Sequence, residues 1–348
     1  MNNAELARPI ISGGSAEAVR PDDGLDEGES EGDGGAEVET RHVDVPIEWH
    51  GSRLDRTLAS LVPEFSRSYL QQLIEAGVVQ LNGAVVVKPS MKTKAGDALI
   101  IELRPTPQSQ AFVPEAMTLD IVFEDAWLLV INKPAGLVVH PAPGNWRGTL
   151  LNGLLARDPQ AGFLPRAGIV HRLDKDTSGL MVVAKQRQTM DQLVGLIAAR
   201  KVSREYLALG HGAWTGAKTL QVDQPVGRDP RNRLRMAVVD LEKTAGKTAQ
   251  TVISLLDTVE RFCLVKCKLH TGRTHQIRVH MASIGHPLVG DDVYGGVPAG
   301  DLGRQGLHAW RLAFAHPATG AAMEFKSSPP ADLQGAFVNL GLRYNKTQ

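Results

Sequence analysis

The segment Gly168-Ile-Val-His171-Arg172-Leu173-Asp174-Lys175-Asp176-Thr177-Ser178-Gly179-Leu180-Met-Val-Val-Ala184-Lys185 carries the strongest structural signal in the chain. It consists of two apolar runs, which are typical of strands, and a charged loop between them that ends in a glycine. Loops held between strands are where proteins usually present reactive groups. A surface hairpin whose charges pair only with one another would have the same pattern. The pattern alone therefore leaves a catalytic loop and a solvated hairpin as alternatives.

The regions on both sides of this segment contain more strand-like runs than helical ones. The expected strands are residues 119–123, 128–132, 169–170, 180–184, 206–209, 248–255, 262–269 and 312–314, and the expected helices are residues 149–156 and 189–199. Because strands and helices do not alternate regularly, we predict an α+β fold with a mixed, mainly antiparallel sheet rather than a doubly wound parallel sheet.

Residues 42–103 predict a small separate unit of two helices and a hairpin. Leucines recur at helical spacing from Leu54 to Leu61, and Ser66 is a suitable N-cap for a second helix that ends at Gly77. Asn82-Gly83 is typical of a hairpin turn, and residues 98–103 predict a further strand.

Composition divides the rest of the chain. We expect a disordered acidic tail over residues 1–41, a Pro- and Gln-rich linker over residues 104–117 and a second domain over residues 118–348. Residues 1–40 hold eleven acidic and two basic residues, which leaves 27 acidic and 36 basic residues for the remainder from totals of 38 each. This basic excess favours a polyanionic partner such as nucleic acid, with a merely solvated cationic surface as the alternative.

Other classes of protein lack their signature here. Gly246-Lys247-Thr248 is similar to the end of a phosphate-binding loop, but Leu241 stands where that motif has a glycine. The chain has neither a run of about 18 apolar residues nor an export signal, so we predict a cytoplasmic protein without membrane spans. His270, His275 and His280 are spaced by five residues; we interpret them as structural histidines and expect no metal site.

The loop from His171 to Leu180 resembles the signature loop of the RluA-type pseudouridine synthases, in which the aspartate of H-R-L-D is the essential carboxylate. Further motifs follow in the order of that family: Asn132 to Pro141, Arg204-Glu-Tyr206, Leu269 to Met281, and His286 to Gly296. Together they cover residues 118–317. The small unit is similar to an S4 domain, an RNA-binding module found in some members of the family.

The resemblance implies a pseudouridine synthase fold and a cofactor-free enzyme that isomerises uridine to pseudouridine in RNA. Asp174 would be the catalytic carboxylate, as a nucleophile or as a base that acts on the sugar. Arg278 would pair with Asp174 and keep it ionised, because a lone carboxylate in an apolar pocket tends to bind a proton. Tyr206 would offer a face on which the base stacks.

The resemblance also implies how RNA is held. Arg172 would occupy the space that a flipped nucleotide vacates, or hold a phosphate, and Lys175 and Arg273 would lie near phosphates. In the S4-like unit the helices and hairpin would face RNA, with the candidate residues Arg53, Arg56, Arg67 and Lys88. The S4 domain and the form of the motifs are most similar to members that modify 23S ribosomal RNA. We therefore expect large-subunit ribosomal RNA or its assembling particle as the partner of a monomeric protein.

Two alternatives belong to other classes. A ribosome-assembly factor could bind RNA without catalysis, but binding alone would not require Asp174, Tyr206 and Arg278 together. A hydrolase with paired carboxylates would need Asp176 as well as Asp174, whereas an isomerase would not depend on Asp176 for the chemical step.

Overall fold

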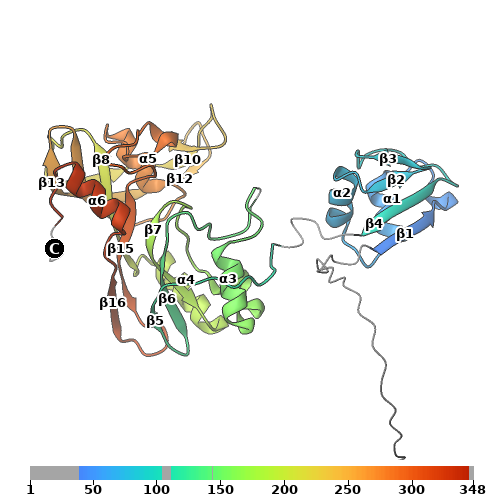
Figure 1. The fold of residues 1–348 in the computed structure, drawn as a ribbon, viewed down its shortest axis with the longest axis horizontal. Helices are drawn as coiled ribbons and strands as arrows, with labels where there is room; N and C mark the ends of the chain where they lie inside the picture. Colours follow the sequence, from blue (N-terminus) through green and yellow to red (C-terminus); the bar gives the residue numbers. More distant parts are fainter. Residues whose placement is uncertain (1–38, 104–110, 143, 345–348) are drawn as a thin grey trace, which may run out of the picture. The chain divides into compact units, whose positions relative to one another are not determined.

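The computed structural model describes residues 39–103, 111–142 and 144–344, and the chain divides into two units, residues 1–104 and 105–348 (Figure 1). The expected acidic tail up to residue 38, and residues 104–110 of the expected linker, lie outside the described residues. In the described part of the chain, no helix is long and apolar enough to cross a bilayer.

The small unit is an antiparallel sheet with two helices. Its four strands have the order β1-β4-β2-β3. The elements are β1 (Glu39–Asp44), α1 (Leu54–Leu61), α2 (Arg67–Glu75), β2 (Val79–Leu81), β3 (Ala84–Val86) and β4 (Ala98–Leu103). Ser66 caps α2 by accepting the N–H of Tyr69, and Asn82 and Gly83 adopt the positive φ angles of a tight hairpin turn. Strand β1 was not expected, because its sequence alternates charged and polar residues around a single valine, Val43.

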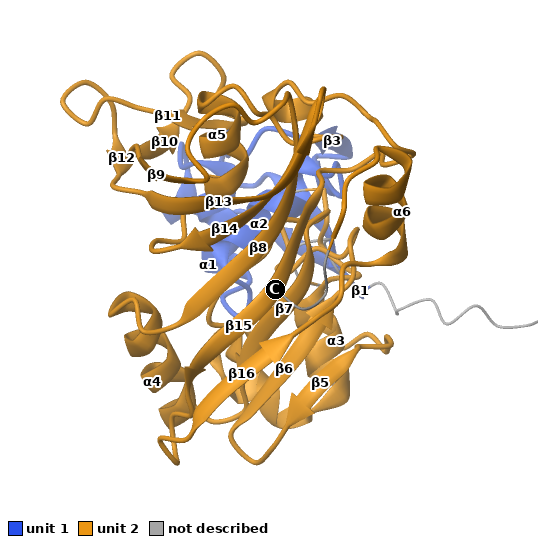
Figure 2. Ribbon diagram, turned by 90° about the vertical axis from the view of Figure 1, so that its left-hand side faces the viewer, with its two compact units in different colours: residues 1–104 blue, residues 105–348 orange. Residues whose placement is uncertain are grey.

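The large unit is built on a nine-stranded sheet (Figure 2). Its strand order is β5-β6-β7-β15-β8-β14-β13-β9, and β16 pairs with β15. Only the pair of β7 and β15 is parallel among the described strands, which confirms the predicted mixed, mainly antiparallel α+β fold. The strands are β5 (Ile121–Glu124), β6 (Leu128–Lys133), β7 (Ser178–Ala184), β8 (Ser203–His211), β9 (Thr219–Asp223), β13 (Gln250–Val259), β14 (Phe262–Leu269), β15 (Leu307–Ala315) and β16 (Ala322–Lys326).

Helices cover both faces of this sheet. On β7, Met181 and Val183 pack into a core that includes α3 (Leu150–Arg157) and α5 (Gln276–Ser283). Leu180 and Val182 point the other way and pack with α4 (Arg187–Ala198), while α6 (Ala331–Asn339) packs against residues of β8 and β14 that also face away from α5. A separate three-stranded sheet is formed by β10 (Val226–Arg228), β11 (Met236–Val238) and β12 (Gly246–Lys247).

The sequence did not predict α5, although it lies in the most informative region. Ile277, Val279 and Met281 alternate as in a strand, and every residue from Gln276 to Met281 is buried. A helix that is buried all round loses the one-sided apolar pattern by which helices are recognised. His275 therefore lies at the N-cap of a helix and His280 on its body, positions that the spacing of the histidines did not reveal.

Asp55 is an unusual residue of the small unit, because it is a fully buried carboxylate in the first turn of α1. It accepts hydrogen bonds from Arg53 at 3.0 Å, from Arg67 at 2.6 Å and from Gln71 at 2.6 Å. Burial alone would raise the pKa of Asp55, but the hydrogen bonds from Arg53 and Arg67 outweigh it and hold the pKa well below its usual range. This cluster ties α1 to α2.

We expect Asp55→Asn to lower the local stability of the small unit by about 2 kcal/mol, because the substitution leaves both guanidinium groups without their charged partner. Hydrogen exchange of the full-length chain, followed by mass spectrometry, should be faster in peptides that cover α1 and α2. Arg56→Gln is the control, since the Arg56 guanidinium only lies over the Trp49 ring. Equal protection of α1 in Asp55→Asn and in the wild type would contradict this account.

Candidate active site

A cavity of about 450 Å³ lies between the charged loop that precedes β7 and the segment that leads into α5. Its lining contains one carboxylate, Asp174, and six arginines: Arg166, Arg172, Arg200, Arg204, Arg273 and Arg278. Tyr206 lines it from β8, on the sheet face that α5 covers. The charged side chains that line the cavity are therefore cationic except for a single carboxylate, that of Asp174.

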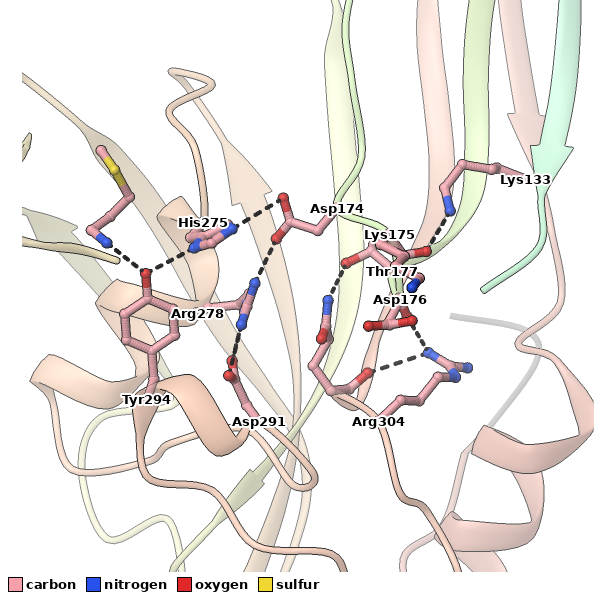
Figure 3. Close-up of polar contacts among 12 residues, drawn as sticks. Lys133, Asp174, Lys175, Asp176, Thr177, His275, Arg278, Asp291, Tyr294 and Arg304 are labelled. Atoms are coloured by element: carbon pink, nitrogen blue, oxygen red, sulfur yellow. Dashed lines mark hydrogen bonds and ion pairs between the residues drawn. The ribbon is translucent and has the colours of Figure 1, made fainter. Parts of the chain in front are cut away.

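Asp174 is held from one side by an arginine. Its Oδ2 atom accepts a hydrogen bond of 3.1 Å from Nη1 of Arg278, and its Oδ1 atom lies 3.8 Å from Nε2 of His275 (Figure 3). The Asp174 side chain retains 17% of its exposure. One carboxylate oxygen is thus engaged by a cation, while the other has no hydrogen bond within the described residues.

Arg278 lies between two carboxylates. Its Nε and Nη2 atoms donate to Asp291 at 2.7 and 2.8 Å, its Nη1 atom donates to Asp174, and its guanidinium lies 5.0 Å from the centre of the Tyr294 ring. Burial would lower the pKa of Arg278, but the hydrogen bonds and charge of Asp291, with the charge of Asp174, raise it above its usual value. Arg278 is therefore permanently charged and fixed in orientation.

His275 completes the same network. It caps α5 with a left-handed backbone, at φ +57°, and its Nδ1 atom lies 2.8 Å from the Tyr294 hydroxyl. That hydroxyl accepts the backbone N–H of Met236, so its own proton is free to bond to Nδ1 of His275. This favours the tautomer in which the Nε2–H of His275 faces Asp174. Burial is the largest cause that lowers the pKa of His275, so the ring is neutral at pH 7.

The loop that carries Asp174 is held by side chains of other elements. Lys133, at the end of β6 and 1% exposed, donates to the carbonyls of Pro134, Leu137 and Lys175 at 2.7 to 2.9 Å. Arg304 donates to the carbonyl of Asp176, and Gln305 donates to the hydroxyl of Thr177 (Figure 3). The segment on the C-terminal side of Asp174 is therefore held at three successive residues, twice through a carbonyl and once through the Thr177 hydroxyl.

The remaining expected residues fall into two groups. Tyr206 is 5% exposed, and burial raises the pKa of its hydroxyl, so that it stays protonated. Arg172 and Arg273 line the cavity, and Arg273 also donates to the carbonyl of Thr248 at 3.1 Å. Lys175 is exposed and is not among the lining residues.

Asp176 also lies outside the lining of the cavity. The structure therefore does not bring Asp174 and Asp176 together as a pair that faces a common substrate, as the hydrolase alternative requires. Across residues 39–103, 111–142 and 144–344, no cluster of His, Cys, Asp and Glu has the composition of a metal site.

The candidate residues of the small unit have different surroundings. Arg53 and Arg67 bond to Asp55 but keep 45% and 50% of their side-chain exposure. Arg56 lies over Trp49, and Lys88 is exposed just after β3.

The sequence indicated only a structural role for His275 and none for Lys133, Asp291 or Tyr294. All four stand inside the quoted motifs, but their residue types gave no reason to single them out. His275 could have been found from its position three residues before Arg278, had the helix been predicted.

We expect Lys133→Met to destabilise the large unit by about 2 kcal/mol at pH 7, because the three carbonyls that accept from the buried amino group lose their donor. Unfolding by urea, followed by tryptophan fluorescence, measures this. Lys175→Met is the matched control, since its amino group is exposed and only its carbonyl contributes to the loop. Equal losses in both variants would contradict the role of Lys133.

The pH dependence of the free energy of unfolding, measured in the same proteins, tests whether burial lowers the pKa of the Lys133 amine. Burial lowers the pKa of Lys133 from 10.5 to about 8, against the opposing charges of Asp176 and Asp174. Between these values the unfolded chain binds a proton that the folded chain does not. The free energy of unfolding of the wild type should therefore rise relative to Lys133→Met as the pH increases from 8 to 10, by up to about 1.4 kcal/mol per pH unit. Parallel pH profiles would refute the assignment.

Two family models match the chain: RNA pseudouridylate synthase over residues 127–283 and S4 domain over residues 52–99. The ribosomal large subunit pseudouridine synthase D of Neisseria meningitidis serogroup A is 48% identical over 312 residues, which cover 86% of this chain and 81% of that protein. The protein of the same name from Pseudomonas aeruginosa is 46% identical over 305 residues, which cover 84% and 93% of the two chains.

Solved structures also match. Human RNA pseudouridylate synthase domain containing 1 superposes with a TM-score of 0.50 at 26% identity, over 66% of this chain and 86% of the human chain.

Proposed function

The chain belongs to the RNA pseudouridylate synthase family, and from this premise we propose that it isomerises specific uridines of large-subunit ribosomal RNA, with Asp174 as the catalytic carboxylate. Family membership makes it an enzyme that converts uridine to pseudouridine in RNA. The ribosomal substrate is supported by the names of its relatives and by the S4 domain. No observation favours the alternative of a non-catalytic assembly factor.

The reaction requires a carboxylate next to a sugar. The bond between N1 and C1′ breaks, and its electron pair leaves with the uracil. The base turns, C5 forms a new bond to C1′, and C5 loses its proton while N1 regains one. No atom is gained or lost overall. The observation that carries the proposal is Asp174, the one carboxylate in the cavity lining, paired with a permanently charged arginine.

Each oxygen of Asp174 has a distinct part in this proposal. Oδ2 is bound to Arg278, whose guanidinium fixes the orientation of the carboxylate. Oδ1 is free to approach the sugar, as a nucleophile at C1′ or as a base. Asp291 takes two of the three donating nitrogens of Arg278, so the arginine holds Asp174 by one hydrogen bond and leaves the carboxylate reactive.

The other residues act on the nucleotide. The target base is stacked inside RNA, so it must be flipped into the cavity at a cost of about a few kcal/mol. The Tyr206 ring lines the cavity and offers a stacking face, and exposed Arg172 is suited to fill the vacated space or hold a phosphate. We assign Arg273 and Lys175 to phosphates nearby.

The proposal extends to the small unit and to the setting of the enzyme. We assign Arg53, Arg56, Arg67 and Lys88 to RNA contacts; the two arginines that bond to Asp55 keep about half of their surface for this purpose. We take the enzyme to act as a monomer, in the cytoplasm, on ribosomal RNA or an assembling subunit.

We expect Asp174→Asn to reduce conversion at least roughly a thousandfold, because the amide can neither attack nor accept a proton from the sugar. Release of tritium from ribosomal RNA labelled at C5 of uridine measures conversion. RNA affinity should stay within a few-fold of the wild type. Asp176→Asn is the matched control and should convert at nearly the wild-type rate. Wild-type conversion by Asp174→Asn would refute the proposal.

We expect Arg56→Gln combined with Lys88→Gln to weaken RNA binding and to reduce its dependence on salt. Each lost phosphate contact should lower the slope of log affinity against log salt concentration by about 0.7 to 0.9. Filter binding at several salt concentrations measures the slope. Arg187→Gln, at the first residue of α4 and outside the cavity lining, is the control. An unchanged slope in the double variant would exclude these two residues from the RNA-binding surface.

A further inference from the structure

The six arginines of the cavity differ in burial. Arg166, Arg172 and Arg200 are exposed, and Arg273 is partly buried, as expected for cations that meet a hydrated RNA backbone. Arg204 and Arg278 are 9% and 5% exposed. Arg278 is neutralised by two carboxylates. Arg204 therefore stands apart, because a buried charge normally has a partner.

The Arg204 guanidinium makes no hydrogen bond or ion pair with any residue in the described ranges, and its buried Nε atom lacks an acceptor. It lies at the start of β8, two residues before Tyr206 and on the same face of that strand. Both side chains line the cavity. The unpartnered guanidinium is therefore next to the aromatic ring that we assign to the base.

The backbone beside Arg204 is shaped to hold it. A Cβ atom added to Gly272 would lie 2.7 Å from Nη1 of Arg204, so any larger residue at position 272 would displace the guanidinium. Gly272 belongs to the segment that leads to His275 and Arg278. The chain thus keeps a buried cation at a defined point in the cavity wall, although nothing in the described structure neutralises it.

We propose that Arg204 is a catalytic residue that binds the uracil while it is detached from the sugar, through the carbonyl oxygens over which the negative charge of the leaving base is spread. This inference rests on the proposed function. Cleavage of the bond between N1 and C1′ leaves an electron pair on the base, and a fixed guanidinium in a buried site stabilises such a charge as it develops. It also keeps the free base from diffusing away before C5 bonds to C1′. A backbone phosphate suits the exposed arginines better than it suits Arg204.

The first test compares rate, affinity and stability in Arg204→Met. The rate of conversion at saturating RNA, in a single turnover, should fall about 100- to 1,000-fold, as for loss of one donor to a developing anion. The dissociation constant of the RNA should stay within about threefold. Because the substitution removes an uncompensated buried charge, the melting temperature of the free protein should be unchanged or higher. Arg204→Lys should recover part of the rate.

The second test is a double-mutant cycle with Gly272→Ala. In the wild type the added methyl group should reduce the single-turnover rate by displacing the guanidinium. In Arg204→Met it should cause no further loss, since its target is gone. Arg187→Met, at the start of α4 and outside the cavity lining, is the control for loss of an arginine.

The measurements distinguish a catalytic role of Arg204 from a phosphate-binding role and from a structural one. Weaker RNA binding with a normal rate at saturation would make Arg204 a phosphate anchor and overturn the proposal. A lower melting temperature, or additive losses in the cycle, would show a structural role and overturn it as well. If the wild type released no tritium, or Asp174→Asn released as much as the wild type, the proposed function itself would fail. Full activity of Arg204→Met beside an inactive Asp174→Asn would refute the inference about Arg204 alone.

Discussion

The position of Arg278 between Asp174 and Asp291 is the constraint on which the site depends. One guanidinium satisfies two carboxylates, and the deeper one, Asp291, takes two of its hydrogen bonds. The two hydrogen bonds to Asp291 fix the arginine, and Asp174 accepts only one, so its second oxygen makes no hydrogen bond within the described residues. An arginine suits this position better than a lysine, because a planar fork with several donors holds two partners at once, whereas an ammonium group would turn toward one of them.

The rest of the large unit supports this contact. The sheet places Tyr206 on the face that α5 covers, and the left-handed start of α5 turns His275 toward Asp174. From the other side, Lys133 and the Arg304–Gln305 pair hold the backbone that follows Asp174. The groups that would meet a substrate therefore come from several segments that are distant in sequence. Each segment is held in place by its own contacts with the sheet, α5 or neighbouring side chains.

Sequence alone predicted those parts of the molecule whose signals are local. Strand β14 was predicted with its observed bounds, and the hairpin at Asn82-Gly83 follows from turn chemistry. Helix α5 was missed because full burial removes the periodicity by which a helix is recognised. Asp291 could not be distinguished from its neighbour Asp292, since only the approach of α5 makes one of them a partner of Arg278. Lys133 could not be identified because a lysine at the end of a strand is normally solvated.

The parallel pairing of β7 with β15 has a consequence for synthesis of the protein. Ser178 pairs with His308, 130 residues later, and its hydroxyl also bonds to the imidazole of His308. During translation Lys133 can hold the Asp174 loop early, but the contacts from Arg278, Arg304 and Gln305 can form only after most of the large unit has emerged. We therefore expect a nascent chain that lacks β15 to be inactive, although the residues of its small unit have already been synthesised. Until β15 arrives, one edge of the pair β6–β7 stays open to wrong partners, and assistance by chaperones is most useful in that interval.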